Sequence, residues 1–279
     1  MPDIFYLLSK WWKPMLSVVL LSLITVALIT FLKPRQYLSV VTALPASSVA
    51  ADKARLYNKN IEYLYSGLGS PDDLDRIIGT AQLDTIYLAV TDQFNLYDHY
   101  KINLEKEKAR IKAAKRLKKY TQVFKSDYGE LKVKVWDTDK NLAPQLANAI
   151  LDKLETIHRY LQSRSNQLSY KSLQSTQQKI RTRIDSLDHV PGIGTIENGM
   201  PSAQRKILFD QWQENEKLIN EYQIMIDNSP PVLMVVEEAK AATKPDKPKP
   251  VQVLIAVALL SIFFAFLLAL ILERRKTTA

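Results

Sequence analysis

Two long uncharged runs dominate the hydrophobic pattern of this chain, one near each end. Pro14–Leu32 and Val251–Leu272 contain no charged residue. A helix that rises about 1.5 Å per residue needs roughly 20 apolar residues to cross the hydrocarbon core of a bilayer. The pattern therefore predicts transmembrane helices at 14–32 and 251–272, and it excludes a simple soluble enzyme.

The first run is typical of a retained anchor rather than of a cleaved signal peptide. Its apolar stretch exceeds the roughly 7–15 residues of a signal peptide. It is followed by Lys33-Pro34-Arg35 and not by a small-residue cleavage site. Trp11 and Trp12 precede it, and two interpretations of this pair stay open. The rings lie either at the membrane interface, which favours amphipathic side chains, or in a helix contact.

Two spans place both ends of the chain on one side of the membrane. Residues 1–13 carry two lysines against one aspartate, and residues 273–279 carry three basic residues against one glutamate. Basic residues flank the other side too, but long loops translocate largely regardless of their charge. We expect cytoplasmic ends at 1–13 and 273–279 and an exported domain at 33–250. The seven residues of 273–279 leave no room for a signalling or kinase domain.

Short periodic patterns fill the first half of the domain at 33–250. Residues 36–44 are rich in β-branched side chains and stop at Pro45, which predicts a strand that leaves the membrane. Residues 52–66 have helical spacing. Ser70 suits a helix N-cap with Pro71 at the first helical position, so a short helix is expected to run to about Ile78. At Ile86–Val90 the periodicity does not decide between strand and helix.

Two clearer patterns come next. Residues 104–119 predict a charge-rich helix with eight lysines or arginines against two glutamates. Residues 131–136 alternate, with Leu131, Val133 and Val135 on one face, which predicts a half-buried strand. Asp137–Asn141 is rich in capping side chains, and Asn141 as the cap makes Pro144 tolerable in the first turn of a following helix.

That helix is predicted to be very long and to form one arm of a hairpin. Apolar residues recur at helical spacing from about 142 to 187, a length on the order of 70 Å. A glycine- and proline-containing loop at 189–203 precedes a second helix at 202–227, which spans only about 39 Å, and a last strand at 232–236. The apolar stripe is as narrow as a coiled-coil seam, and the arms do not match, so we expect other copies of the chain to cover them. The predicted oligomer or hairpin seam comprises Leu161, Leu168, Leu173, Ile180 and Trp212.

The net positive charge of the chain is concentrated in one predicted helix. The chain carries a formal net charge of +9, although its 47% hydrophobic and 24% charged residues are ordinary. Most of the excess lies in the helix at 104–119. One interpretation is that this helix meets lipid phosphates, or the pyrophosphate or acidic sugars of a growing glycan; the other is a solvated helix face. Nucleic acid is not an expected partner of an exported patch. The candidate anion-binding residues are Lys108, Lys112, Lys115, Arg116 and Lys119.

Motifs of catalysis are not found. The chain has no cysteine, which excludes disulfides and thiolate metal sites. Gly192-Ile193-Gly194 lacks the third glycine of a dinucleotide fingerprint, and the histidines have no metal-ligand spacing. Glu237-Glu238 fits solvation near the membrane better than a pair of catalytic carboxylates. We expect no catalytic residue, no metal and no cofactor.

The order of these parts resembles the polysaccharide co-polymerases, the Wzz-type chain-length determinants of bacterial surface polysaccharides. The resemblance covers nearly the whole chain and rests on four passages, of which the last, a proline- and lysine-rich segment that runs into the second span, is the most telling. Prolines cannot sit inside a regular helix and favour extended backbone, so this segment makes a stiff collar, or else a linker. The passages are Asp3–Tyr37, Lys132–Asn148, Val232–Ala239 and Lys244–Pro250.

The resemblance implies a non-enzymatic scaffold that sets the chain length of a surface polysaccharide such as lipopolysaccharide O-antigen. It also implies an anchor in the bacterial inner membrane, with the domain at 33–250 in the periplasm. Copies would form a homo-oligomer, whose collar at Pro245, Pro248 and Pro250 would contact a membrane-embedded polysaccharide polymerase. A growing lipid-linked glycan is a further candidate partner. The exported part is shorter than is common in the family, and the prolines lie before the apolar run more than within it. No nucleotide-binding domain follows, unlike in co-polymerases that are fused to a tyrosine kinase.

The expected fold is an α+β membrane protein, with two transmembrane helices flanking a periplasmic α/β base that carries a long helical hairpin. Two other functions stay open from the residues alone. A two-span periplasmic sensor or adaptor shares the architecture but needs a cytoplasmic output. An export-channel adaptor for capsule or exopolysaccharide shares most of it as well.

Overall fold

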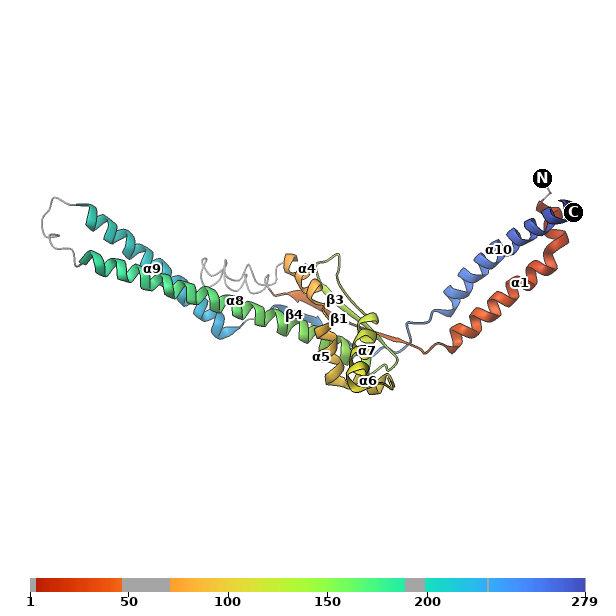
Figure 1. Cartoon of the computed structure of the whole chain (residues 1–279), viewed down its shortest axis with the longest axis horizontal. Coiled ribbons are helices and arrows are strands. Elements are labelled where there is room, and N and C mark those ends of the chain that lie inside the picture. Colours follow the sequence, from red (N-terminus) through yellow and green to blue (C-terminus); the bar gives the residue numbers. More distant parts are fainter. Residues whose placement is uncertain (1–3, 47–70, 189–198, 230, 279) are drawn as a thin grey trace. The chain divides into compact units, whose positions relative to one another are not determined.

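The computed structural model describes residues 4–46, 71–188, 199–229 and 231–278 (Figure 1). The predicted helix at 52–66, the cap at Ser70 and the loop at 189–198 lie outside these residues. The chain divides into two compact units. Unit 1 combines Met1–Ser39, Trp136–Ala143 and Ala241–Ala279, and unit 2 combines Val40–Val135 and Pro144–Lys240.

Unit 1 contains the two apolar helices that the sequence predicts. Helix α1 (Ile4–Leu32) and helix α10 (Pro250–Thr278) pack side by side (Figure 1). The segments Ser9–Leu32 and Pro250–Arg274 are long and apolar enough to cross a membrane. Large aliphatic and aromatic side chains on both helices stay exposed, among them Leu21, Phe31 and Leu260. Such outward apolar surface is expected of helices whose solvent is lipid.

A four-stranded sheet joins segments that are far apart in the sequence. Its strands are β1 (Tyr37–Pro45), β2 (Thr121–Lys125), β3 (Leu131–Asp137) and β4 (Leu233–Glu237), in the order β2-β3-β1-β4. The pair β1–β4 is antiparallel, with a register shift between Thr42 and Ala43. The pair β2–β3 is a hairpin, which runs from Thr121 opposite Val135 to Lys125 opposite Leu131.

The alternation predicted for β3 is confirmed. Leu131, Val133 and Val135 are fully buried, whereas Lys132 and Lys134 are partly exposed on the other face. Strand β2 was not predicted, although Gly129, whose φ of 76° suits a tight turn, separates it from β3. Predicted strands at 36–44 and 232–236 correspond to β1 and β4 within one residue.

The described residues from 71 to 119 of unit 2 form four helices. They are α4 (Pro71–Thr80), α5 (Asp84–Phe94), α6 (Leu96–His99) and α7 (Lys106–Lys119), and α5 and α6 pack against α7. The ambiguous stretch at 86–90 is helical, since Ile86, Tyr87 and Val90 are buried at helical spacing within α5. The left-handed backbone of Asn95 ends this helix.

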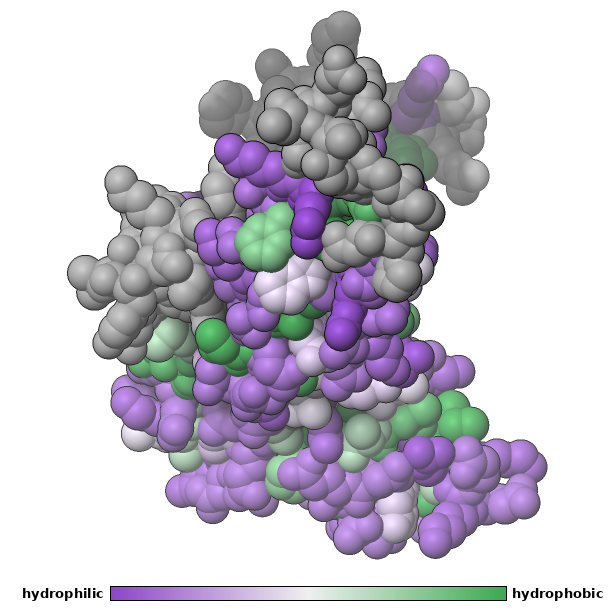
Figure 2. All heavy atoms as spheres, turned by 90° about the vertical axis from the view of Figure 1, so that its left-hand side faces the viewer, coloured by the Kyte–Doolittle hydropathy of each residue, from purple (hydrophilic) through white to green (hydrophobic). Residues whose placement is uncertain are grey.

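The helical hairpin has unequal arms, as predicted. Helix α8 (Leu142–Asp188) has 47 residues and α9 (Gly199–Asn228) has 30, or about 70 Å against about 45 Å. Helix α9 begins three residues before the predicted start. The first turns of α8 belong to the core, with Leu146, Ile150 and Leu154 fully buried. On the face that Figure 2 shows, hydrophilic residues cover most of the described surface and hydrophobic ones form small separate groups.

Candidate functional surfaces

The collar segment, Lys244–Pro250, is held by backbone hydrogen bonds to the residue that precedes β1. The amide of Gln36 donates to the carbonyl of Lys247 at 2.9 Å, and the amide of Asp246 donates to the carbonyl of Gln36 at 2.8 Å. The two stretches therefore run antiparallel as a single bridge. Pro245 is exposed and Pro248 and Pro250 are partly exposed, so all three rings keep surface that is open to solvent.

Trp136, near the end of β3, completes this contact with its side chain. The indole Nε1 donates to Oδ2 of Asp246 at 2.7 Å. The ammonium Nζ of Lys247 lies 3.9 Å from the centre of the Trp136 ring, a cation–π contact. We call Gln36, Trp136, Asp246 and Lys247 the collar clasp. It was not predicted, because its only local signal is a large aromatic residue on the solvent face of a strand.

A second polar contact joins the two apolar helices. Glu273 of α10 is 8% exposed and accepts from two side chains of α1. Lys10 Nζ lies 2.6 Å from Oε1, and the indole of Trp11 donates to Oε2 at 2.8 Å. This charge-assisted cluster fixes how the helices meet at that end. Of the two tryptophans, Trp11 therefore makes a helix contact, whereas Trp12 is 54% exposed.

The candidate basic residues of α7 separate into two groups. Lys108, Lys112, Lys115 and Lys119 are exposed. Arg116 is partly buried, with its guanidinium 4.4 Å from the centre of the Tyr100 ring, so it lies apart from the others. Two further cations are paired within the unit. Arg110 donates to both carboxylate oxygens of Asp92 at 2.7 Å, and Lys118 Nζ lies 2.7 Å from Oδ1 of Asp84.

These pairs shift the ionisation of their acidic partners. Hydrogen bonding to Lys118 lowers the pKa of Asp84, and hydrogen bonding to Arg110 lowers the pKa of Asp92. Burial raises the pKa of Tyr87 to about 12, with a further contribution from the negative charge of Asp84. The buried hydroxyl of Tyr87 donates to the carbonyl of Ala81 at 2.9 Å. These shifts arise from packing and ion pairing in the core and at its margin.

The predicted seam residues have unequal environments. Leu161 and Leu168 are 52% and 62% exposed, whereas Ile180 is buried and Leu173 and Trp212 are partly buried. Trp212 stacks on Phe209, with ring centres 6.1 Å apart. The hairpin is further held by buried Asn215, whose amide donates to the carbonyl of Leu173 at 3.0 Å and to Oε1 of Gln177 at 2.6 Å. Of the predicted apolar seam, Ile180 and in part Leu173 and Trp212 are thus shielded from solvent, whereas Leu161 and Leu168 stay exposed.

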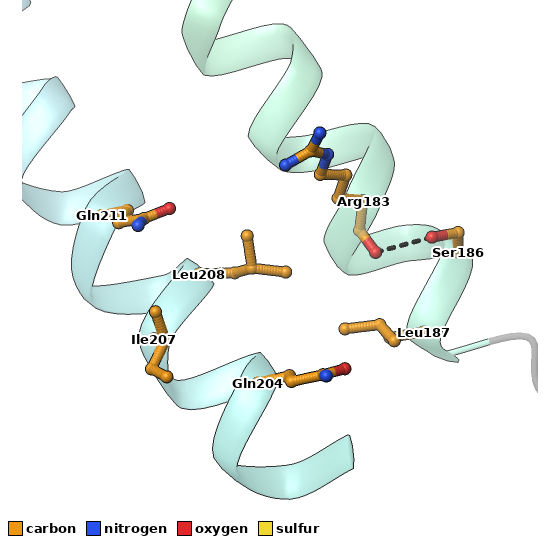
Figure 3. A pocket seen from close by; sticks show the side chains of 7 residues that line it. All are labelled: Arg183, Ser186, Leu187, Gln204, Ile207, Leu208 and Gln211. Atoms are coloured by element: carbon orange, nitrogen blue, oxygen red, sulfur yellow. Dashed lines mark hydrogen bonds between the residues drawn. The ribbon is translucent and has the colours of Figure 1, made fainter. Parts of the chain in front are cut away.

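A groove of about 390 Å³ lies between α8 and α9, near the ends that Asp188 and Gly199 mark (Figure 3). Leu187 and Leu208 face each other across it, and amide, hydroxyl and guanidinium groups surround them. This groove was not predicted from the sequence. Its groups donate and accept hydrogen bonds but include no paired nucleophile and base. The lining residues are Arg183, Ser186, Leu187, Gln204, Ile207, Leu208 and Gln211.

Two of the histidines and the adjacent glutamates Glu237 and Glu238 show no catalytic arrangement. His158 Nε2 lies 3.0 Å from the hydroxyl of Thr80, and the ring of His99 packs against Tyr100. Within the described ranges, no group of three or more histidine, aspartate and glutamate residues is placed to hold a metal ion. Glu237 and Glu238 are exposed, and Lys240 Nζ lies 4.0 Å from Glu237.

Searches of protein-family models and of curated proteins found no match to this chain. Among solved structures it is similar to a full-length bacterial polysaccharide co-polymerase, with 14% identity, a TM-score of 0.41, and 99% of this chain and 98% of that chain covered. It is similar to a fragment of WzzB, a polysaccharide co-polymerase from Salmonella Typhimurium, with 14% identity and a TM-score of 0.35. A third similar structure is a point mutant of the Shigella flexneri lipopolysaccharide O-antigen chain-length regulator, with 10% identity and a TM-score of 0.30. The last two alignments each cover 76% of this chain and 100% of the other.

Proposed function

We propose that this chain is a non-enzymatic regulator of the chain length of a surface polysaccharide such as lipopolysaccharide O-antigen. The collar clasp carries the proposal. Of the four passages in which the sequence resembles the co-polymerases, the first supplies Gln36, the second supplies Trp136, and the last supplies Asp246 and Lys247. Passages up to 211 residues apart in sequence, from Gln36 to Lys247, thus form one contact in unit 1.

In this proposal the domain at 33–250 is periplasmic and both ends of the chain are cytoplasmic. The helices α1 and α10 anchor the chain in the inner membrane. The collar clasp ties the second anchor to the base of the sheet, so the prolines Pro245, Pro248 and Pro250 have a defined place on the protein. A rigid, partly exposed surface of this kind suits a contact with a membrane-embedded polymerase, because little conformational entropy is lost on binding. The growing lipid-linked glycan is the second proposed partner of the assembly.

The chain acts as a homo-oligomer in this proposal. Leu161 and Leu168 are exposed on α8, at the spacing of a coiled-coil seam, and the sheet ends in a strand, β4, whose Val235 and Val236 are more than half exposed. Another copy of the chain would remove these apolar side chains from water. The regulator would form no bond itself; it would hold polymerase and glycan together for a limited number of additions.

Deletion of the gene, followed by complementation with the full chain, tests the proposed function. Surface polysaccharide is separated by length on a gel, and its total sugar is measured in parallel. We expect the modal length to change in the deletion strain while total polymer persists, and complementation to restore the original mode. Loss of all polymer, or an unchanged length distribution, would contradict the proposal. A control chain with Ser175, an exposed residue of α8, changed to alanine should complement fully.

A further inference from the structure

Helix α7 presents a row of four lysines that the rest of unit 2 does not use for packing. Lys108, Lys112, Lys115 and Lys119 follow one another at intervals of four, three and four residues, so they lie along one face of the helix. We call them the lysine stripe. The row extends over about 16 Å. The opposite side of the helix is buried through Ala109, Ala113 and Leu117.

The cations beside the stripe are already paired, whereas the stripe is open to a ligand. Arg110 and Lys118 bind Asp92 and Asp84, and Arg116 lies over a tyrosine ring. Among the described residues, the one ion pair of the stripe joins Lys108 to Glu105 at 3.0 Å, and both side chains are more than 70% exposed. An exposed pair of that kind is weak and exchanges readily with another anion.

Two exposed aliphatic side chains accompany the stripe and favour a lipid surface over a soluble anion. Ile111, on the flank of the stripe, is 41% exposed, and Leu104, just before the helix, is 50% exposed. Lysines combined with exposed aliphatic residues are typical of segments that lie at a membrane interface, where the charges meet lipid phosphates and the apolar groups enter the headgroup region.

Within unit 2, the stripe ends close to Val135, the residue after which the chain passes into unit 1. Helix α7 stops at Lys119, and Thr121, two residues later, pairs with Val135, after which the chain leaves unit 2. Unit 2 begins at Val40, eight residues after α1 ends at Leu32, so a fully extended connection spans about 28 Å at most. A bilayer that holds α1 is therefore covalently kept near unit 2, at a high effective concentration for a surface ligand.

We propose that the lysine stripe docks on anionic lipid headgroups of the bilayer in which α1 and α10 are anchored. The inference rests on the anchoring part of the proposed function. Its test needs neither glycan nor polymerase, so a negative result would leave the proposed role in chain-length control untouched. Each lysine near an anionic surface contributes about fivefold to the ratio of docked to undocked forms. Removal of four charges is expected to lower this ratio more than about a hundredfold.

Fluorescence quenching in reconstituted bilayers tests the proposal with the full chain. Because the chain has no cysteine, Ile111→Cys gives a single labelling site for a fluorophore, and Ser175→Cys on α8 gives a control site. The bilayers contain a lipid with a quencher on its headgroup, in phosphatidylcholine alone or with phosphatidylglycerol. We expect strong quenching at position 111 only with phosphatidylglycerol, and its loss in about 1 M salt, which shortens the screening length to about 3 Å.

Three quadruple variants separate the effect of the stripe from that of net charge. Changing all four stripe lysines to glutamine should abolish the quenching, and changing them to arginine should preserve it. Changing four exposed hairpin lysines, Lys171, Lys179, Lys206 and Lys217, to glutamine removes the same charge and should leave it intact. Equal quenching in neutral and anionic bilayers, or none in either, would overturn the proposal. So would a response to added polygalacturonate in neutral bilayers with none to phosphatidylglycerol, which would assign the stripe to acidic glycans.

Discussion

The collar clasp yields a prediction whose magnitude follows from its geometry. Trp136→Phe keeps an aromatic ring beneath Lys247 but removes the indole N–H that Asp246 accepts at 2.7 Å. The three backbone hydrogen bonds between Gln36 and the collar segment remain available in the variant. The collar segment should therefore open more often without any change in the rest of the fold.

A hydrogen bond to a charged group contributes about 1.5–3 kcal/mol, and the lower end applies here because Trp136 and Asp246 are partly exposed. The weaker cation–π contact of phenylalanine adds a few tenths of a kcal/mol at such a site. The expected cost is therefore about 2 kcal/mol. Since about 1.4 kcal/mol corresponds to a tenfold change in an equilibrium, opening should increase roughly 30-fold.

Hydrogen exchange of the full chain in bilayers measures this opening. The amides of Asp246 and Lys247 donate to Gln36, so their exchange in peptides that cover 241–249 should accelerate roughly 30-fold in Trp136→Phe. Asp246→Ala should give a similar rate, and the double variant should be little faster, because both changes remove the same bond. Trp212→Phe, in the hairpin, is the matched control. Unchanged exchange at 241–249 in Trp136→Phe, or fully additive effects in the double variant, would refute the reasoning.

Three further predictions concern stability and assembly. Burial raises the pKa of Tyr87 to about 12, so this hydroxyl loses its proton at lower pH in the unfolded chain than in the folded one. The free energy of unfolding should therefore fall as the pH rises from about 10 to about 12. Urea unfolding in detergent should show a smaller fall for Tyr87→Phe than for the unchanged chain, and an identical fall in both would contradict the prediction. Asn215→Ala should destabilise the hairpin by about 1–2 kcal/mol in urea unfolding, whereas Asn220→Ala, at an exposed position of α9, should have little effect. The double variant Leu161→Glu and Leu168→Glu should dissociate the homo-oligomer without unfolding it, as measured by the mass of the complex in detergent; an unchanged mass would exclude this seam.

Local periodicity predicted the elements that are long or strictly alternating. The two apolar runs, the strand at 131–136 and the hairpin of unequal arms follow from spacing alone, because burial imposes that spacing. Strand β2 escaped prediction because five residues with a single buried position, Val123, carry almost no period. At 86–90 an apolar run of that length fits a strand or a helix, and packing against α7 decides the outcome.

The candidate surfaces depend on contacts that no local pattern records. The prolines of the collar segment are visible in composition, but the partner of Asp246 is Trp136, 110 residues away. The excess charge of α7 is also visible in the sequence. Only the structure shows that Arg110, Arg116 and Lys118 pack against partners in unit 2, whereas the one ion pair of the stripe among the described residues is the exposed Lys108–Glu105 contact. The residue types indicated which segments are proline-rich or basic, but tertiary contacts determine which of their side chains stay exposed for binding.

The proposed function requires this chain to change the length of a polysaccharide without forming its bonds. In a reconstitution experiment, the purified full chain is added, in proteoliposomes, to membranes that contain a polymerase and its lipid-linked substrate but no regulator of their own. The number of repeats per product and the total number of bonds formed are both measured. We expect the added chain to shift the modal number of repeats while the total number of bonds stays unchanged. A change in total bonds with no shift in the mode would contradict it.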